Sequence, residues 1–151
     1  MSEKTQRLYI AYGSNLNLQQ MAFRCPTATV VGTSVLRNMR LLFRGESGNA
    51  VATVERYKGG TVPILVWELQ PRDEAALDVY EGYPHFYRKE TMRITLNGKR
   101  VSAMVYIMNA GHTLGLPGMF YLNAIREGYR SAGFDVEVLQ QAVKASIVKE
   151  E

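Results

Sequence analysis

The pattern of hydrophobic and polar positions predicts strands and helices that follow one another in irregular order. Runs rich in β-branched and aromatic residues indicate strands over residues 8–11, 27–43, 49–55 and 61–69. In the last of these runs Pro63 predicts an edge position or a bulge, because proline lacks the N–H that a sheet ladder needs. Residues 87–108 predict a hairpin, because Asn97-Gly98 suits a type I′ turn between two β-rich runs.

Helical spacing of apolar residues appears in four segments, at residues 15–24, 71–80, 120–131 and 135–147. The segment 71–80 is the clearest, since Pro71 suits the first helical position and Gly82 can supply a left-handed residue past the end. Asp135 can cap the last helix. Strands mixed with a few helices predict an α+β fold rather than a doubly wound sheet. No linker or repeat interrupts the pattern, so we expect one domain over residues 1–151.

Charge and composition narrow the class of protein. The chain has 151 residues and a formal net charge of +4, but its eighteen Lys and Arg residues are spread along the sequence. The densest groups, "LRNMRLLFRG" and "YRKETMR", interleave with apolar residues as amphipathic strands do. We therefore expect a solvated surface that can attract small anions, and no nucleic-acid partner. One cysteine, a polar start and no long apolar stretch predict a cytoplasmic protein with no membrane partner, and the oligomeric state stays open.

Metal and nucleophile chemistry find little support in the sequence. His85 and His112 have no ligand spacing to each other or to Cys25, so no bound metal is expected. Cys25 is interpreted as a small buried residue. Ser14 lies outside a Gly-x-Ser-x-Gly elbow, and no phosphate-loop or dinucleotide fingerprint occurs.

The segment Tyr12-Gly13-Ser14-Asn15 follows the first predicted strand and has two interpretations. It can be a plain strand-to-helix turn, in which Gly13 adopts a positive φ and Ser or Asn caps the helix. Alternatively, successive N–H groups at a tight turn before a helix can bind a carboxylate or a developing oxyanion. The residues alone leave the two interpretations open.

Glu81 closes the helix 71–80, where the negative end of the helix dipole disfavours a carboxylate. Its neighbours are aromatic and rather apolar, and both effects raise the pKa of a carboxyl group. Such a group suits general acid/base catalysis, although an exposed helix-end glutamate is the simpler interpretation. Five tyrosines can line a pocket or fill the core: Tyr80, Tyr83, Tyr87, Tyr121 and Tyr129.

Five segments occur in an order that resembles the γ-glutamylcyclotransferase family, including its AIG2-like members. They are "YGSN", "NAVATV", "VWEL", "LDVYEG" and "PGMFYLNAIREGY". The resemblance runs from about Leu8 to Gly133, and the compact "EGYPHFYRK" resembles the short members, which include γ-glutamylamine cyclotransferases and bacterial homologues.

The resemblance implies an α+β fold with a small β-barrel and flanking helices. It also implies an enzyme that releases an amine or amino acid from a small γ-glutamyl amide and leaves 5-oxoproline. The α-amine of the substrate itself attacks its γ-amide carbonyl, so neither a metal nor a cofactor is expected. The alternative is a non-catalytic small-ligand-binding or interaction domain of the same fold.

The resemblance further implies roles for individual residues. Glu81 becomes the catalytic acid/base. The substrate-binding residues become Tyr12, Gly13, Ser14, Asn15 and, on the late helix, Tyr121, with Tyr87 as a weaker candidate.

Overall fold

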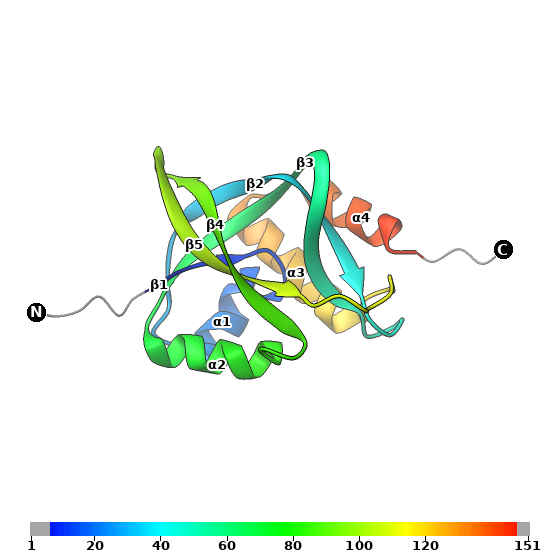
Figure 1. Ribbon diagram of the computed structural model, residues 1–151, viewed down its shortest axis with the longest axis horizontal. Helices are drawn as coiled ribbons and strands as arrows, with labels where there is room; N and C mark the ends of the chain where they lie inside the picture. The colour runs from blue at the N-terminus through cyan, green and yellow to red at the C-terminus, as the bar shows by residue number, and fades with distance from the viewer. Residues whose placement is uncertain (1–6, 148–151) are drawn as a thin grey trace, which may run out of the picture.

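The computed structural model describes residues 7–147 and shows a strongly curled sheet flanked by helices (Figure 1). The strands are β1 Arg7–Ala11, β2 Thr29–Arg44, β3 Val51–Leu69, β4 Tyr87–Leu96 and β5 Lys99–Met108. The helices are the 3₁₀ turn η1 Ser14–Leu16 and α1 Leu18–Arg24, α2 Pro71–Glu81, α3 Met119–Ala132 and α4 Val136–Ala145. None of these helices, within residues 7–147, is long and apolar enough to span a bilayer. The first six residues of the polar start and the last four of the expected domain lie outside the described part.

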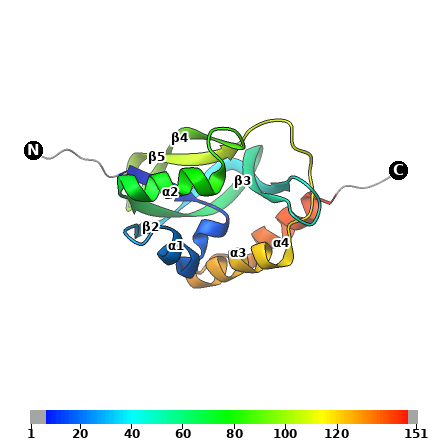
Figure 2. The ribbon, with the colours of Figure 1, turned by 90° about the horizontal axis from the view of Figure 1, so that it is seen from below.

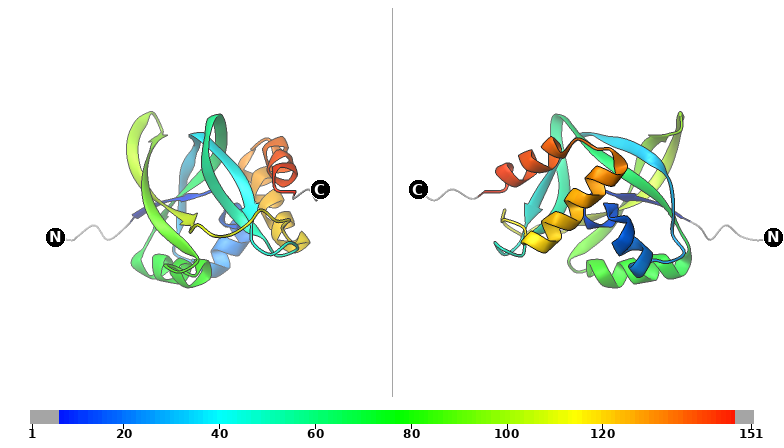
Figure 3. Two further views of the ribbon diagram at one scale, coloured as in Figure 1. Left: turned by 45° about the vertical axis from the view of Figure 1, so that its right-hand side comes forward. Right: turned by 180° about the vertical axis from the view of Figure 1, so that it is seen from behind.

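The sheet has the strand order β2-β3-β1-β5-β4, with β1 antiparallel to β3 and parallel to β5. Its curl brings the two end strands together at one point, where the Ser34 hydroxyl donates to the Thr95 carbonyl at 2.5 Å. Away from that point the β2–β3 and β4–β5 hairpins diverge (Figure 3). The α+β fold is thus confirmed, and the expected small barrel is a curled sheet that closes only in part.

Strand β3 is continuous from Val51 to Leu69, where the sequence predicted two strands. The pairing with β2 still breaks between those two strands, because Thr61 faces Arg37 whereas Arg56 faces Met39. Residues 57–60 of β3 lie opposite the single residue Asn38 of β2, so β3 forms a bulge there. A bulge bends a strand without ending it. Pro63 lies beyond the last β1–β3 pair, Ala11 with Leu65, so the expected edge position is confirmed locally.

The hairpin turn and the caps at Gly82 and Asp135 behave as predicted. Asn97 and Gly98 have φ values of 52° and 82°, as a type I′ turn requires. Gly82 ends α2 in the left-handed region with φ 67°. The side chain of Asp135 caps α4 by accepting from the N–H of Glu137 at 2.9 Å.

The core lies between the sheet and the helices α3 and α4, which run along one side of it (Figure 2). Ile10 of β1, Phe43 of β2 and Ile64 of β3 are fully buried there. Ile125 and Tyr129 of α3 are also fully buried, so Tyr129 belongs to the core rather than to a pocket.

Helix α3 also holds the 3₁₀ turn in place. Gly128 packs so closely on this turn that an added Cβ would lie 2.5 Å from the Cβ of Leu16 and 2.8 Å from its carbonyl oxygen. One turn earlier, the carbonyl of Ala124 accepts from the Asn17 side chain at 3.0 Å. The position of η1 therefore depends on the absence of a side chain at residue 128.

We expect Gly128→Ala to destabilise the protein by roughly 1–3 kcal/mol, because overpacking forces η1 away from α3. In an uncrowded helix the same change would stabilise by about 1 kcal/mol. Urea unfolding gives the free energy of unfolding, with Arg130→Ala on the exposed face of α3 as the control. A variant as stable as the wild type would contradict the close packing at Leu16.

Candidate active site

A cavity of about 220 Å³ lies where β1, η1, the end of α2 and the start of α3 meet. Aromatic side chains form most of its wall, and a single carboxylate, Glu81, faces it. The lining residues are Tyr9, Tyr12, Gly13, Ser14, Asn15, Val51, Ala52, Tyr80, Glu81, Phe86, Tyr87, Tyr106 and Tyr121.

The structure brings all six predicted site residues to this one cavity. They are Glu81, Tyr12, Gly13, Ser14, Asn15 and Tyr121, and the weaker candidate Tyr87 lies there too. The side-chain amide of Asn15 reaches the carboxylate of Glu81, with 3.4 Å between Nδ2 and Oε2. Residues 66 positions apart in the chain therefore share one pocket.

The turn after β1 differs from its prediction in two respects. Gly13 has φ −125° and ψ −127°, so the expected positive φ is wrong. Glycine instead avoids crowding, because an added Cβ would lie 3.2 Å from the Cβ of Ala52. The capping residue is Asn17, whose side chain accepts from the N–H of Gln20 at 3.0 Å, because the turn η1 delays the start of the helix.

The turn η1 lines the cavity and uses only some of its backbone donors in hydrogen bonds within the protein. The N–H of Leu16 donates to the Gly13 carbonyl, and that of Asn17 to the Ser14 carbonyl, both at 3.0 Å. The N–H groups of Ser14 and Asn15 have no protein acceptor among residues 7–147. The Ser14 hydroxyl lies 2.8 Å from the Tyr80 hydroxyl, which fixes the turn against α2.

Asn15 is buried and joins the elements around the cavity. Its Nδ2 donates to the Tyr9 hydroxyl of β1 at 2.8 Å, and its Oδ1 accepts from Arg24 at the end of α1. Its carbonyl accepts from the indole N–H of Trp67 on β3 at 3.1 Å. The side chain of Asn15 is thereby fixed in the orientation that faces Glu81.

Glu81 is the last residue of α2 and is partly buried against the cavity. Burial raises the pKa of its carboxyl group to about 7, and the positive charge of Arg24 opposes that rise. The Arg24 guanidinium stacks on the Tyr80 ring, 3.6 Å from its centroid. The carboxyl group is therefore not that of an exposed helix-end glutamate, and it changes charge near neutral pH.

Three buried tyrosines of the cavity, Tyr9, Tyr12 and Tyr121, stay neutral over the same range. Burial raises the pKa of Tyr9, Tyr12 and Tyr121 well above the ordinary tyrosine value. The Tyr121 hydroxyl accepts from the N–H of Ala52 at 2.9 Å, and the Tyr87 hydroxyl donates to the Ala52 carbonyl at 2.6 Å. These contacts anchor β3 at the cavity. Among the described residues, Glu81 is the only carboxylate that lines the cavity.

Several contributors were missed by the sequence prediction. Tyr9 and Tyr106 lie on strands, where an inward aromatic residue looks like ordinary core, and Phe86 lies in a turn. Arg24 lies outside the lining and acts on it through Asn15 and Tyr80. No local pattern distinguishes these residues from structural ones.

Cys25 is buried, as predicted, and its thiol donates to the Asp73 carbonyl at 3.5 Å. Burial raises the thiol pKa to about 11, which suppresses the thiolate. It is a structural residue at the end of α1.

Comparison with known proteins identifies relatives over most of the chain. The human γ-glutamylcyclotransferase is 27% identical over 147 residues, which cover 91% of this chain and 77% of the relative. The bovine γ-glutamylcyclotransferase is 27% identical over 86% of this chain and 73% of the relative.

Solved structures show the same fold. A γ-glutamyl cyclotransferase structure has a TM-score of 0.80 at 24% identity, covering 97% of this chain and 90% of that one. An AIG2-like protein from mouse has a TM-score of 0.59 at 17% identity, over 72% of this chain and 80% of its own. The similarity is thus more extensive to the first structure than to the second.

The family model described as γ-glutamyl cyclotransferase, AIG2-like, matches residues 9–122, which run from β1 into the first turn of α3. This match includes every residue that lines the cavity. The chain therefore belongs to the γ-glutamyl cyclotransferase, AIG2-like family, whose named relatives are enzymes of the cyclotransferase type.

Proposed function

We propose that the protein is a γ-glutamylcyclotransferase-type enzyme in which Glu81 is the general acid/base. One observation carries the proposal: a carboxyl group that titrates near neutrality and a turn with free backbone donors line the same small cavity. The chain belongs to a family whose relatives bear this activity in their names. The substrate class is a small γ-glutamyl amide, which yields 5-oxoproline and a free amine or amino acid.

The cavity suits the glutamyl part of such a substrate. The N–H groups of Ser14 and Asn15 can hold its α-carboxylate or the amide oxygen that gains charge during attack. Tyr121 and Tyr87 supply aromatic wall to the same cavity. When the γ-glutamyl group of the substrate is held in a folded conformation, its α-amine lies close to its γ-carbonyl carbon. This proximity lowers the entropic part of the activation barrier.

The proton moves through Glu81. The α-amine nitrogen forms a bond to the γ-carbonyl carbon, and the Glu81 carboxylate accepts the proton which that nitrogen loses. The bond from the carbonyl carbon to the leaving nitrogen then breaks, and Glu81 returns the proton to the departing amine. A pKa of about 7 suits both steps, because the group is neither strongly acidic nor strongly basic.

The competing function is a non-catalytic domain that binds a small ligand in the same cavity. The two differ in one measurement: incubation with a panel of γ-glutamyl amino acids and amines yields 5-oxoproline only from an enzyme. Saturable binding without any product would favour the binding domain.

We also propose that residues 1–151 act as one domain and that the protein is cytoplasmic. The free thiol of Cys25 supports this location, because a reducing compartment preserves thiols.

Glu81→Gln should lower the rate of 5-oxoproline release by orders of magnitude, since glutamine keeps the size and hydrogen bonding of the residue but cannot accept the proton. The measurement is product release from the best γ-glutamyl amide of the panel. Glu68→Gln on β3, outside the cavity, is the control and should retain wild-type activity. Wild-type turnover by Glu81→Gln would rule Glu81 out as the base.

Gly13→Val should reduce activity by about a hundredfold, comparable to the loss of one oxyanion donor. Its side chain would press on Ala52, since an added Cβ alone would lie 3.2 Å from the Ala52 Cβ, and would move the turn. Ser14→Ala removes only the hydroxyl contact with Tyr80 and should have a smaller effect. Initial rates of 5-oxoproline release show which variant loses more activity. A larger loss in Ser14→Ala than in Gly13→Val would indicate that the Ser14 hydroxyl, rather than the backbone of the turn, holds the substrate.

The raised pKa of Glu81 predicts a pH-dependent stability difference. The native carboxyl keeps its proton up to pH about 7, whereas the unfolded one loses it near its ordinary value of 4.5. The native state therefore loses stability as pH rises from about 4.5 to about 7. The Glu81→Gln variant has no group that titrates at this position, so its free energy of unfolding does not fall in this way. By pH 8 that free energy should have risen by up to about 3 kcal/mol relative to the wild type. Urea unfolding from pH 4.5 to 8 measures it; a gain that is constant with pH would contradict the raised pKa.

A further inference from the structure

A second cavity, of about 1100 Å³, lies between the diverging β2–β3 and β4–β5 hairpins. Its lining includes six arginines and only two acidic residues, Glu55 and Glu90. The arginines are Arg37, Arg44, Arg56, Arg88, Arg93 and Arg100, and we call this cavity the arginine trough. It plays no part in the proposed ring closure, and what binds in the trough is independent of that reaction.

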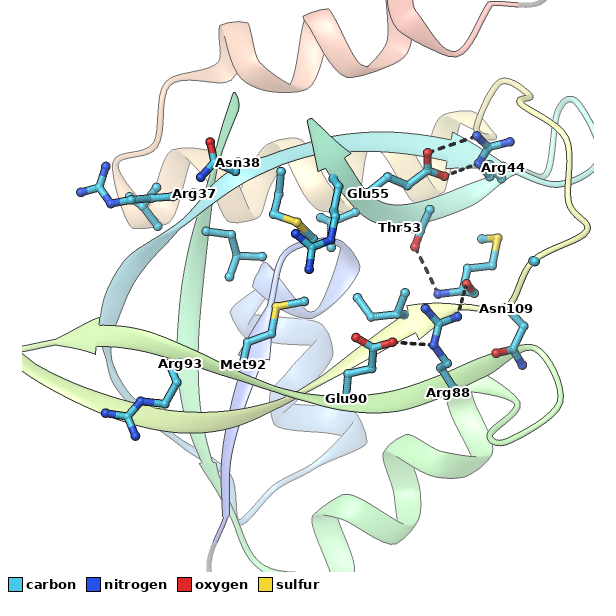
Figure 4. Close-up of a pocket in the computed structure, with 18 of the residues that line it drawn as sticks. Arg37, Asn38, Arg44, Thr53, Glu55, Arg88, Glu90, Met92, Arg93 and Asn109 are labelled. Carbon is cyan, nitrogen blue, oxygen red and sulfur yellow. Dashed lines mark hydrogen bonds and ion pairs between the residues drawn. The ribbon is translucent and has the colours of Figure 1, made fainter. Parts of the chain in front are cut away.

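Arginines that are scattered along the sequence come together in the arginine trough. Its lining has a formal charge of +4, which equals the net charge of the whole chain. The groups "LRNMRLLFRG" and "YRKETMR", expected to be solvated surfaces of strands, supply opposite walls. Arg37 and Arg44 come from β2, whereas Arg88 and Arg93 come from β4 (Figure 4).

Part of this charge is already balanced. Arg44 pairs with Glu55 at 2.5 Å and Arg88 with Glu90 at 2.6 Å. Within residues 7–147, the other four arginines form no ion pair: Arg37, Arg56, Arg93 and Arg100. Arg37 and Arg93 lie toward one end of the trough, and the two paired arginines toward the other (Figure 4). The uncompensated cations therefore favour an anionic occupant that extends along the trough.

The other lining residues favour one class of anionic occupant over another, an acidic peptide over a nucleic acid. Leu36, Val54 and Ile107 are buried apolar residues of the trough. None of its lining side chains is a phenylalanine, tyrosine or tryptophan. Proteins that bind single-stranded nucleic acid stack the bases on aromatic residues, so this lining favours an occupant with acidic and aliphatic side chains.

The end strands of the sheet add a backbone template. Among residues 7–147, β4 forms a strand ladder only with β5, over the whole span from Tyr87 to Leu96 and without a register shift. Its outer edge is therefore open except near Thr95, whose carbonyl accepts from the Ser34 hydroxyl of β2. The corresponding edge of β2 is covered at its far end, where the N–H of Phe43 donates to Ser146 of α4 at 2.8 Å. An open, regular edge is the surface to which an extended peptide adds as a further strand.

We propose that the arginine trough binds an extended acidic peptide segment, which adds to the outer edge of β4. Alternate side chains of a strand point to opposite faces, so acidic residues at every second position can meet the arginines while aliphatic ones meet the buried apolar residues. The partner is a protein with an exposed segment of this pattern.

The test uses a fluorescein-labelled peptide of four Glu-Val repeats, which spans about 27 Å when extended. Fluorescence anisotropy should show saturable binding to the wild type that weakens as salt rises. Arg37→Gln combined with Arg93→Gln should weaken binding at least about tenfold, since two charge-assisted contacts are lost. The matched control, Arg126→Gln with Arg130→Gln, removes equal charge from α3 outside the trough and should bind like the wild type.

Two further probes separate strand addition from simple charge attraction. A peptide of four glutamates followed by four valines has the same composition without alternation, and it should bind at least about tenfold more weakly. An oligothymidylate of equal charge should also bind more weakly than the alternating peptide. Equal binding of either probe, equal weakening in the α3 control, or no saturable binding by the wild type would overturn the proposal.

Discussion

The buried side chain of Asn15 is the contact on which the geometry of the cavity depends. It donates to Tyr9 and Glu81, accepts from Arg24, and its carbonyl accepts from Trp67, so it connects β1, α1, α2 and β3. Buried polar groups are costly unless every hydrogen bond is made, and a satisfied network of this kind selects one arrangement of its members. The short turn η1 can thus be rigid although it has a single helical turn of its own.

Much of the fold was predictable because it is encoded locally. Asn97-Gly98 specifies its turn, Pro71 and Gly82 mark the ends of α2, and Asp135 caps α4. The position of Glu81 follows from Gly82, since the residue before a left-handed cap ends the helix. The family resemblance then indicated which turn should face that glutamate.

The remaining features depend on contacts between distant segments. The crowding that favours glycine at residue 13 comes from Ala52, and the stricter requirement for glycine at residue 128 comes from Leu16. Neither requirement appears as a pattern in the neighbouring sequence. The arginine trough was missed for the same reason, because arginines from distant strands become a concentrated charge only when the sheet curls. Local propensity predicts elements, whereas the curl of the sheet determines which faces meet.

The two cavities share a wall at the beginning of β3. Ala52 lines the small cavity and its neighbour Thr53 lines the arginine trough, so the two cavities adjoin within one strand. The Tyr87 hydroxyl holds the Ala52 carbonyl at 2.6 Å, and the Thr53 hydroxyl accepts from the Met108 N–H at 3.2 Å. A displacement of β3 on one side therefore moves an atom that lines the other.

The bond from Trp67 to the carbonyl of Asn15 gives the molecule an intrinsic optical reporter. Trp67 is the only tryptophan of the chain, and its buried indole touches the turn beside the cavity without lining the cavity itself. Its ultraviolet emission responds to the polarity and hydrogen bonding of that one location. The state of the turn can therefore be followed in solution without attaching a dye.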